Sequence, residues 1–173
     1  PKPEFIVATG GTITTVCTNF KVHTFTGPGT FTVCSVGNAA GSNTVDYLVI
    51  AGGGAGGNNH AGGGGAGGTR FSDGTASGCY TAGPSPLGAS ALPVSATGFP
   101  ITVGAGGAGS TGITSRSSAG ANSIFSTITS TGGGPGGNRE NNGAPPVIPG
   151  LPGGSGGGGG GACNPGTVGN GNT

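Results

Sequence analysis

The protein has 173 residues, and its 46 glycines and 13 prolines make up roughly a third of it, above the level of about 25–30% at which disorder is the usual expectation. Only 5% of the residues are charged and the formal net charge is +1, which is untypical of a disordered chain. The five cationic residues are scattered and form no patch for nucleic acid, and no apolar run reaches the about 18–20 residues needed to span a membrane.

The sequence predicts an N-terminal arm over residues 1–11. Its apolar run at residues 5–8 lies between two prolines and a pair of glycines, as strands often do. Two placements fit this pattern: a strand of the chain's own sheet, or an exposed arm that completes the sheet edge of a neighbouring copy by strand addition. The candidate assembly residues are Phe5, Ile6, Val7 and Ala8.

A glycine-rich β-sandwich domain is predicted for residues 12–137, and its first strands are expected at 12–17, 20–26 and 30–36. The last two are separated by Gly27-Pro28-Gly29, which is a tight-turn signal. Apolar residues alternate along both of these strands. They are therefore expected to pair as a hairpin with one side on the core.

The next strand is predicted at residues 45–51, and it is apolar on both faces. Val45, Tyr47 and Val49 share one face, whereas Leu48 and Ile50 share the other. This pattern predicts a central strand that is covered on both sides. The residues expected in the core are Phe31, Val33, Tyr47, Leu48, Val49, Ile50, Ile101 and Ile124.

Three predicted strands run directly into glycine tracts: 45–51 into 52–57, 99–103 into 104–109, and 122–131 into 132–137. A helix is not expected in these tracts, because each glycine costs about 1 kcal/mol relative to alanine in a helix interior. Flexible coil or an extended, polyproline-II-type chain remains. Because the strands hold the tract ends close together, the sequence favours ordered tracts that hydrogen-bond to one another as a polyglycine-II lattice.

Residues 138–173 are predicted to form a Pro/Gly-rich C-terminal segment. Four prolines between residues 145 and 152 interrupt it, and an unbroken glycine run follows at 156–161. Proline lacks the backbone N–H that regular structure uses, so this segment is expected to be partly irregular.

One glycine motif imitates a cofactor site. Gly52-x-Gly54-x-x-Gly57 follows a predicted strand and matches the dinucleotide fingerprint, with Asp73 at about the expected distance of 20 residues. The fingerprint needs a helix whose N-terminus holds the pyrophosphate, and the glycines and alanines of residues 58–68 do not favour one. No nucleotide or other cofactor is therefore expected.

Residues that carry out catalysis or bind metals are few and dispersed. The acids are Glu4, Asp46, Asp73 and Glu140, and the histidines are His23 and His60. No pair has the spacing of a carboxylate dyad, a zinc site or a nucleophile motif. Neither an enzyme nor a metal site is expected.

Four cysteines allow three disulfide pairings. Cys17 and Cys34 lie on neighbouring predicted strands and form the candidate disulfide. The alternative is that both are free, small, buried hydrophobes, which is the better expectation if assembly takes place in a reducing cytoplasm.

Residues 20–33, with their Phe-Thr-Gly-Pro-Gly hairpin signal, resemble the glycine-rich structural proteins of tailed bacteriophages. So do the strand at 45–51 with its glycines and the segments 61–80, 99–109 and 122–134. The similarity spans residues 12–137. It implies a virion or tail-fibre role, and related glycine-rich adhesin tips pack polyglycine-II helices.

We therefore predict an all-β fold, a jelly-roll-like β-sandwich with polyglycine-II-type tracts beside it. The leading hypothesis is a non-enzymatic structural subunit of an extracellular fibre or filament, such as a phage tail-fibre or virion surface protein. Its expected partners are copies of itself and a host cell-surface receptor or glycan. Two alternatives stay open: a secreted, cell-derived filament subunit that polymerises by exchanging its N-terminal strand, and a monomeric module whose glycine loops bind a surface glycan or porin.

Overall fold

The structure is a computed structural model that describes residues 1–58, 60–74, 89–112, 115–138 and 148–160. Within these ranges the chain is all-β with no helix, which confirms the predicted class. The chain forms two compact units, each built from separate segments. Unit 1 comprises Pro1–Val49, Arg70–Thr102 and Phe125–Ile128, and unit 2 comprises Ile50–Thr69, Val103–Ile124 and Thr129–Thr173.

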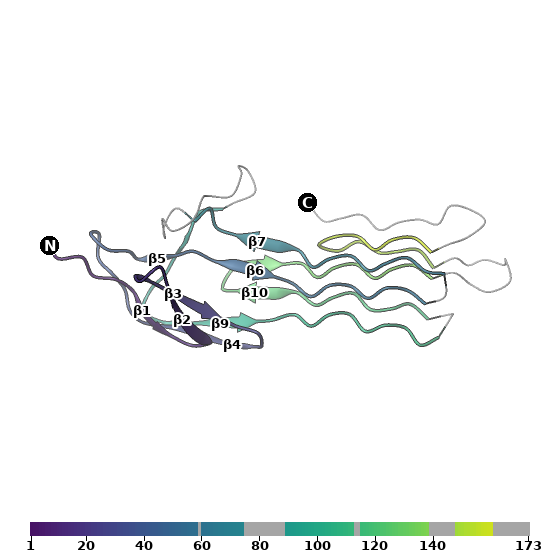
Figure 1. Ribbon diagram of the computed structural model, residues 1–173, viewed down its shortest axis with the longest axis horizontal. Helices are drawn as coiled ribbons and strands as arrows, with labels where there is room; N and C mark the ends of the chain where they lie inside the picture. Colours follow the sequence, from purple (N-terminus) through teal and green to yellow (C-terminus); the bar gives the residue numbers. More distant parts are fainter. Residues whose placement is uncertain (59, 75–88, 113–114, 139–147, 161–173) are drawn as a thin grey trace. The chain divides into compact units, whose positions relative to one another are not determined.

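The largest sheet has five strands in the order β1-β4-β9-β10-β11 (Figure 1). The strands β1 and β4 pair antiparallel with Ala8 opposite Val33, and β4 and β9 pair antiparallel with Phe31 opposite Phe99. Their bounds are β1 Val7–Thr9, β4 Gly29–Ser35, β9 Gly98–Thr102, β10 Ser123–Phe125 and β11 Ile128–Ser130.

The hydrophobic core of unit 1 is built around aromatic rings. Phe125 makes edge contacts with three rings, at centroid distances of 6.0 Å to Phe31, 6.2 Å to Phe99 and 6.4 Å to Tyr47. Such T-shaped pairs are the favoured aromatic geometry. The fully buried members of the core are Phe31, Val33, Val49, Val94 and Phe125.

The predicted strand at 45–51 is broken in the structure. The strand β5 (Thr44–Val45) pairs with β8 (Leu92–Pro93), and β6 (Leu48–Ile50) pairs with β7 (Thr69–Phe71). Between β5 and β6, Tyr47 and Ser72 are joined by backbone and side-chain bonds. The Ser72 N–H donates to the Tyr47 carbonyl, the Tyr47 N–H donates to Ser72 Oγ, and that hydroxyl donates to Asp46 Oδ1.

The prediction that this strand is covered on both sides is wrong. Val49 is buried as expected, but Leu48 and Ile50 are 64% and 57% exposed. The face of β6 that carries Leu48 and Ile50 lies in solvent, as one face of an antiparallel sheet commonly does. Of the other predicted core residues, Phe31 and Val33 are buried, whereas Tyr47, Ile101 and Ile124 are half-buried.

The predicted hairpin across Gly27-Pro28-Gly29 is also wrong. The strand β3 (Phe20–Thr24) pairs with β2 (Thr12–Val16), and β4 pairs with β1 and β9 instead. The β2–β3 loop turns through Cys17 and Thr18, whose φ angles are 49° and 68°. After β3, the Phe25 ring packs on Gly29. The ring therefore lies in the segment where the sequence predicted hydrogen bonds between the two strands.

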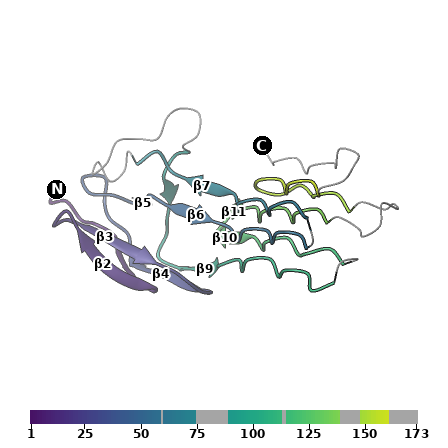
Figure 2. The same cartoon turned by 45° about the vertical axis from the view of Figure 1, so that its right-hand side comes forward.

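The glycine tracts are ordered and hydrogen-bonded, as predicted (Figure 1, Figure 2). We number the tracts 1 (51–57), 2 (62–68), 3 (104–109), 4 (115–121), 5 (131–138), 6 (148–153) and 7 (154–160). Partners along one tract advance by three residues, the period of a polyproline-II-type helix. Between tracts 1 and 2, for example, the N–H groups of Ala51, Gly54 and Gly57 donate to the carbonyls of Gly68, Gly65 and Gly62 at 3.0, 2.8 and 2.9 Å.

Tracts 6 and 7 belong to residues that the sequence assigned to an irregular C-terminal segment. In the described part of that segment, Leu151 donates to the Pro135 carbonyl, and Gly158 donates to the Gly63 carbonyl at 2.8 Å. Residues 148–160 therefore extend the hydrogen-bonded array of unit 2.

Candidate assembly and recognition surfaces

The predicted assembly residues lie at the edge of the five-stranded sheet. Val7 and Ala8 are in β1, which is bonded to β4 on one side only. Ile6 and Ala8 pack against the core of unit 1, whereas Phe5 and Val7 are 66% and 52% exposed. Since the arm pairs within its own chain here, its donation to a neighbouring copy stays a prediction.

The loop after β4 holds the backbone of the arm through Asn38. The Asn38 side-chain amide donates to the Lys2 carbonyl at 2.8 Å, and its oxygen accepts from the Glu4 N–H at 3.2 Å. A Cβ at Gly37 or Gly41 would overlap the Glu4 carbonyl. These glycines let the arm lie directly against the loop backbone.

Gly10 and Gly11 turn the chain from β1 into β2. Their φ angles are 107° and 63°, a region that residues with a Cβ adopt at a cost. The carbonyl of Gly10 lies 2.8 Å from Nδ1 of His23, whose ring meets Phe31 edge-on at 5.0 Å. The two glycines therefore connect the arm to β2.

The candidate disulfide pair is not bridged. Cys17 lies in the β2–β3 loop and Cys34 lies in β4, and both are exposed free thiols. Cys79 and Cys163 lie outside the described residues. A bridge between Cys17 and Cys34 stays a prediction.

In unit 1, Asp46 and Tyr47 hydrogen-bond to the side chain of Ser72. Ser72 is 1% exposed, and its hydroxyl joins the Asp46 carboxylate to the Tyr47 backbone. Within the described ranges, no three His, Cys, Asp or Glu side chains gather as a metal site would require. Over the same ranges, no helix has the length and apolarity to cross a membrane.

The dinucleotide-like glycines of tract 1 are part of the array. The N–H of Gly52 donates to the Ala121 carbonyl and that of Gly54 to the Gly65 carbonyl. Residues 62–68 form the next tract rather than the helix that a pyrophosphate would need.

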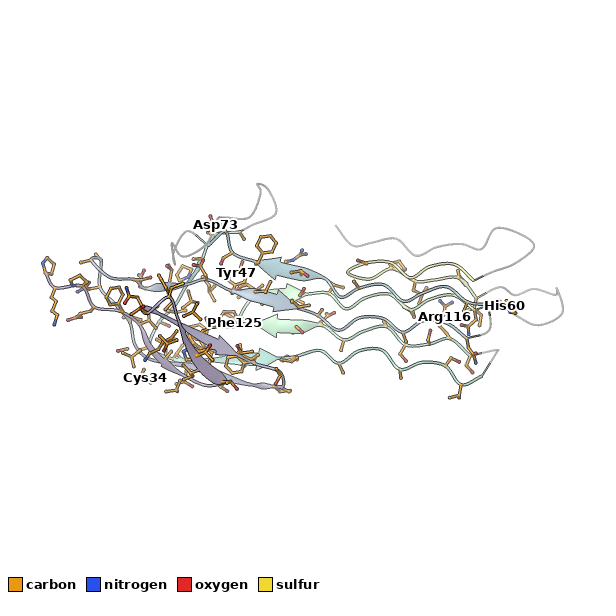
Figure 3. The ribbon with its side chains drawn as sticks, viewed as in Figure 1. Cys34, Tyr47, His60, Asp73, Arg116 and Phe125 are labelled. Atoms are coloured by element: carbon orange, nitrogen blue, oxygen red, sulfur yellow. The ribbon has the colours of Figure 1, made fainter. Side chains whose placement is uncertain are left out.

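The loop end of the array collects larger polar side chains. Figure 3 shows His60 and Arg116 at the same end of the tracts. Both are exposed, and Arg116 donates to the Pro149 carbonyl at 2.5 Å. Among the described residues of unit 2, Arg116 is the one charged side chain.

Asn138 ties this end together and is 0% exposed. Its side-chain oxygen accepts from the Asn58 N–H at 2.7 Å, its side-chain amide donates to the Ser115 carbonyl, and its own N–H donates to the Ile148 carbonyl. Sequence reasoning missed it. The available signal was its position as the first long polar side chain after a glycine tract.

Comparison with known proteins gives one match. Residues 25–173 match the model of a family described as "Glycine-rich domain". No curated protein and no solved structure matches the chain.

Proposed function

The chain belongs to the glycine-rich domain family, and we propose that it is a non-enzymatic structural subunit of an extracellular fibre or filament. Because its sequence resembles glycine-rich structural proteins of tailed bacteriophages, a phage tail fibre or a virion surface is the leading setting. The observation that carries the proposal is the array of glycine tracts in unit 2, in which backbone bonds to backbone with a three-residue period. Such an array supplies ordered length while placing few reactive side chains on its surface.

We propose that subunits join through the N-terminal arm. The β1–β4 pairing is the one that a donated arm would reproduce between neighbouring copies, as in domain swapping. The arm follows this scheme in two respects: β1 is an edge strand of three residues, and Gly10-Gly11 connects it to β2. Repeated head to tail, this exchange gives an open filament.

Deletion of residues 1–9 tests this mode of assembly. Electron microscopy of the full chain is expected to show regular filaments, and the deletion variant is expected to give soluble subunits that form no filaments and keep the tract array intact. A synthetic peptide of residues 1–9 should then bind the truncated subunit without polymerising it. Filaments that form normally without the arm would overturn arm exchange. A full chain that stays monomeric at every concentration would overturn the fibre proposal itself.

The polar loop end of the array supports a second candidate, a module that binds a surface glycan or porin. His60 and Arg116 are exposed there, and the buried Asn138 hydrogen-bonds to Asn58 and Ser115, which are close to them in sequence. A guanidinium donates several hydrogen bonds in a fixed geometry and suits carboxylate or phosphate groups on a glycan.

Binding to an array of immobilised bacterial surface glycans tests this candidate. The double variant of His60→Ala and Arg116→Ala is expected to lose binding, whereas Lys21→Ala on β3 serves as a matched loss of charge elsewhere. Equal binding by the wild type and the double variant would rule out a recognition site at this end.

A further inference from the structure

Some glycines of the array are not explained by packing within the chain. A Cβ built at Gly53 would lie 3.6 Å from its nearest neighbour, and at Gly56 or Gly106 the distance would be 3.7 Å. At Gly63 and Gly109 a Cβ would meet nothing within 4 Å. None of these residues has a positive φ. The fold itself would accept a side chain at each of them.

Most glycines in the same tracts are different. A Cβ at Gly52 would overlap the Ala105 carbonyl, and one at Gly54 would overlap the Gly134 carbonyl. These positions need glycine because a neighbouring backbone occupies the space. The unexplained positions recur every third residue between them, so they face one direction along each tract.

The hydrogen bonds place the unexplained glycines on one face. Tracts 3, 1 and 2 form one row, since Gly107 donates to Gly53 and Gly54 donates to Gly65. The inner side of this row is bonded to a second row of tracts 4, 5 and 7, for example from Gly52 to Ala121 and from Ser155 to Ala66. We call the other side the open face, with Gly53, Gly56, Gly63, Ala66, Gly106 and Gly109, all of which are exposed.

Backbone donors on the open face are unpaired. The N–H groups of Gly53, Gly56, Gly63, Gly106 and Gly109 donate to no atom within the described chain. On the inner side of the same row, N–H groups at the same three-residue spacing bond to the second row at 2.7 to 3.1 Å. The open face is therefore an unsatisfied lattice edge, comparable with the edge of a sheet.

The charge and shape of this face fit a second copy of the chain. It carries no charged side chain and no side chain larger than a methyl, so two copies would neither repel each other nor be held apart. Any occupant must offer backbone groups at a three-residue spacing with no Cβ in the way. Another copy meets these conditions, because the carbonyls of Gly54 and Gly57 in its tract 1 accept no hydrogen bond within the described chain and can accept from the unpaired N–H groups.

We propose that two copies of this protein dock through their open faces and extend the polyglycine lattice between molecules. This inference rests on the proposed structural function and adds a lateral contact that is separate from the N-terminal arm. The glycines at positions 53, 56, 63, 106 and 109 are accounted for by the approach of the partner's backbone.

A matched pair of double variants tests the proposal in the full chain. Gly53→Val with Gly106→Val fills the open face, and Ala119→Val with Ala121→Val adds similar bulk to exposed positions of tract 4 in the second row. Sedimentation over a range of concentrations gives the oligomeric state, and amide exchange at Gly54 and Gly65 reports that the array is folded.

Below the concentration at which filaments form, the wild type and the tract 4 variant are expected to dimerise, with the Gly53 and Gly63 amides protected where dimers form. The open-face variant is expected to keep protected Gly54 and Gly65 amides while dimerising at least about tenfold more weakly. Equal association by both variants, or a dimer in which Gly53 and Gly63 stay unprotected, would overturn the proposal. If the open-face variant loses protection at Gly54, the single variant Gly63→Val replaces it, and the same outcomes decide.

The two levels of assembly fail separately. Loss of filaments on deletion of residues 1–9 with the dimer retained supports both proposals. Filaments without lateral dimers would support the proposed fibre function and overturn docking through the open faces. Dimers in a full chain that never forms filaments would support docking through the open faces and overturn the fibre function.

Discussion

Glycine has two roles in the tracts at the scale of single residues. A Cβ at Gly54 would overlap the Gly134 carbonyl, and one at Gly64 would overlap the Gly54 carbonyl, whereas one at Gly63 would enter open space. Residue type alone does not separate these cases. The difference depends on which side of each turn faces a neighbouring tract.

Substitution of an enclosed glycine by valine should therefore disrupt the array. Gly54→Val or Gly64→Val is expected to lower the free energy of unfolding by at least the about 1–3 kcal/mol typical of overpacking, because the obstructing atoms belong to backbone. Gly63→Val is the matched control and should unfold at nearly the wild-type temperature in dilute solution. Equal thermal stability of all three variants would show that the tracts are not packed on one another.

Replacement of Asn138 should affect residues that are distant from it in the sequence. Asn138→Ala removes the hydrogen bonds of the half-buried Asn58 N–H and of the Ser115 carbonyl, which belongs to an exposed residue, and this is expected to cost about 0.5–1.5 kcal/mol per lost hydrogen bond. Asn122→Ala is the control, because Asn122 is exposed and water can replace it as the acceptor for the Gly132 N–H. Faster amide exchange at Asn58 in the first variant alone is the expected result. Unchanged exchange there would contradict the role given to Asn138.

At the scale of elements, sequence patterns identified strands better than they identified strand partners. The runs at 12–17, 20–26 and 30–36 each contain a strand, β2, β3 and β4. The Gly-Pro-Gly signal nevertheless did not join the last two, since β3 pairs with β2 through a turn at Cys17 and Thr18, which have positive φ, and β4 pairs with β1 and β9. Neither residue type favours that conformation, so the sequence holds no clear signal for the turn.

This turn predicts a stabilising substitution. Thr18→Gly removes a β-branched residue from a left-handed conformation, which costs roughly 1–2 kcal/mol, offset in part by the entropy of glycine. We expect a gain of up to about 1 kcal/mol in the free energy of unfolding. Thr15→Gly within β2 should instead destabilise the hairpin. A loss of stability for Thr18→Gly, measured by chemical denaturation, would contradict the turn geometry.

The exposure of β6 leads to another prediction. A covered Leu48 would lose about 2–5 kcal/mol on truncation to alanine, but Leu48 is 64% exposed, and Leu48→Ala is expected to change the free energy of unfolding by no more than about 0.5 kcal/mol. Val33→Ala, at a side chain that is 2% exposed, should cost about 2 kcal/mol. Urea denaturation of both variants checks the contrast. A larger loss of stability for Leu48→Ala than for Val33→Ala would contradict the assignment of Leu48 to the exposed face of β6.

At the scale of the whole molecule, composition was enough to predict the all-β class and the glycine tracts. The arrangement of the tracts depends on hydrogen bonds between distant parts of the sequence. The loss of side chains after residues 51, 103 and 131 was enough to predict ordered, three-residue-period glycine tracts. That residues 148–160 join the array was not predictable from their prolines. It depends on bonds to distant tracts, such as those from Leu151 to Pro135 in tract 5 and from Gly158 to Gly63 in tract 2.

The candidate surfaces were predicted only in part. The apolar run at residues 5–8 identified the arm, because period and flanking residues are local signals. The polar loop end and the open face were not predictable, since each brings together residues from tracts that are distant in the sequence. Asn138 and Arg116 illustrate this, since Asn138 donates to Ser115 in tract 4 and Arg116 donates to Pro149 in tract 6.

The ordered array of glycine tracts is the central claim, and amide hydrogen exchange in the full chain tests it most directly. The account predicts strong protection at Gly54, Gly65 and Gly133, whose N–H groups donate to carbonyls of neighbouring tracts at 2.8 to 2.9 Å. In the monomer, Gly53 and Gly56 should exchange at the rate of an unprotected amide, although they are neighbours of Gly54 in the same tract. Exchange of all five amides at the unprotected rate would show that the tracts are mobile coil and would contradict the account.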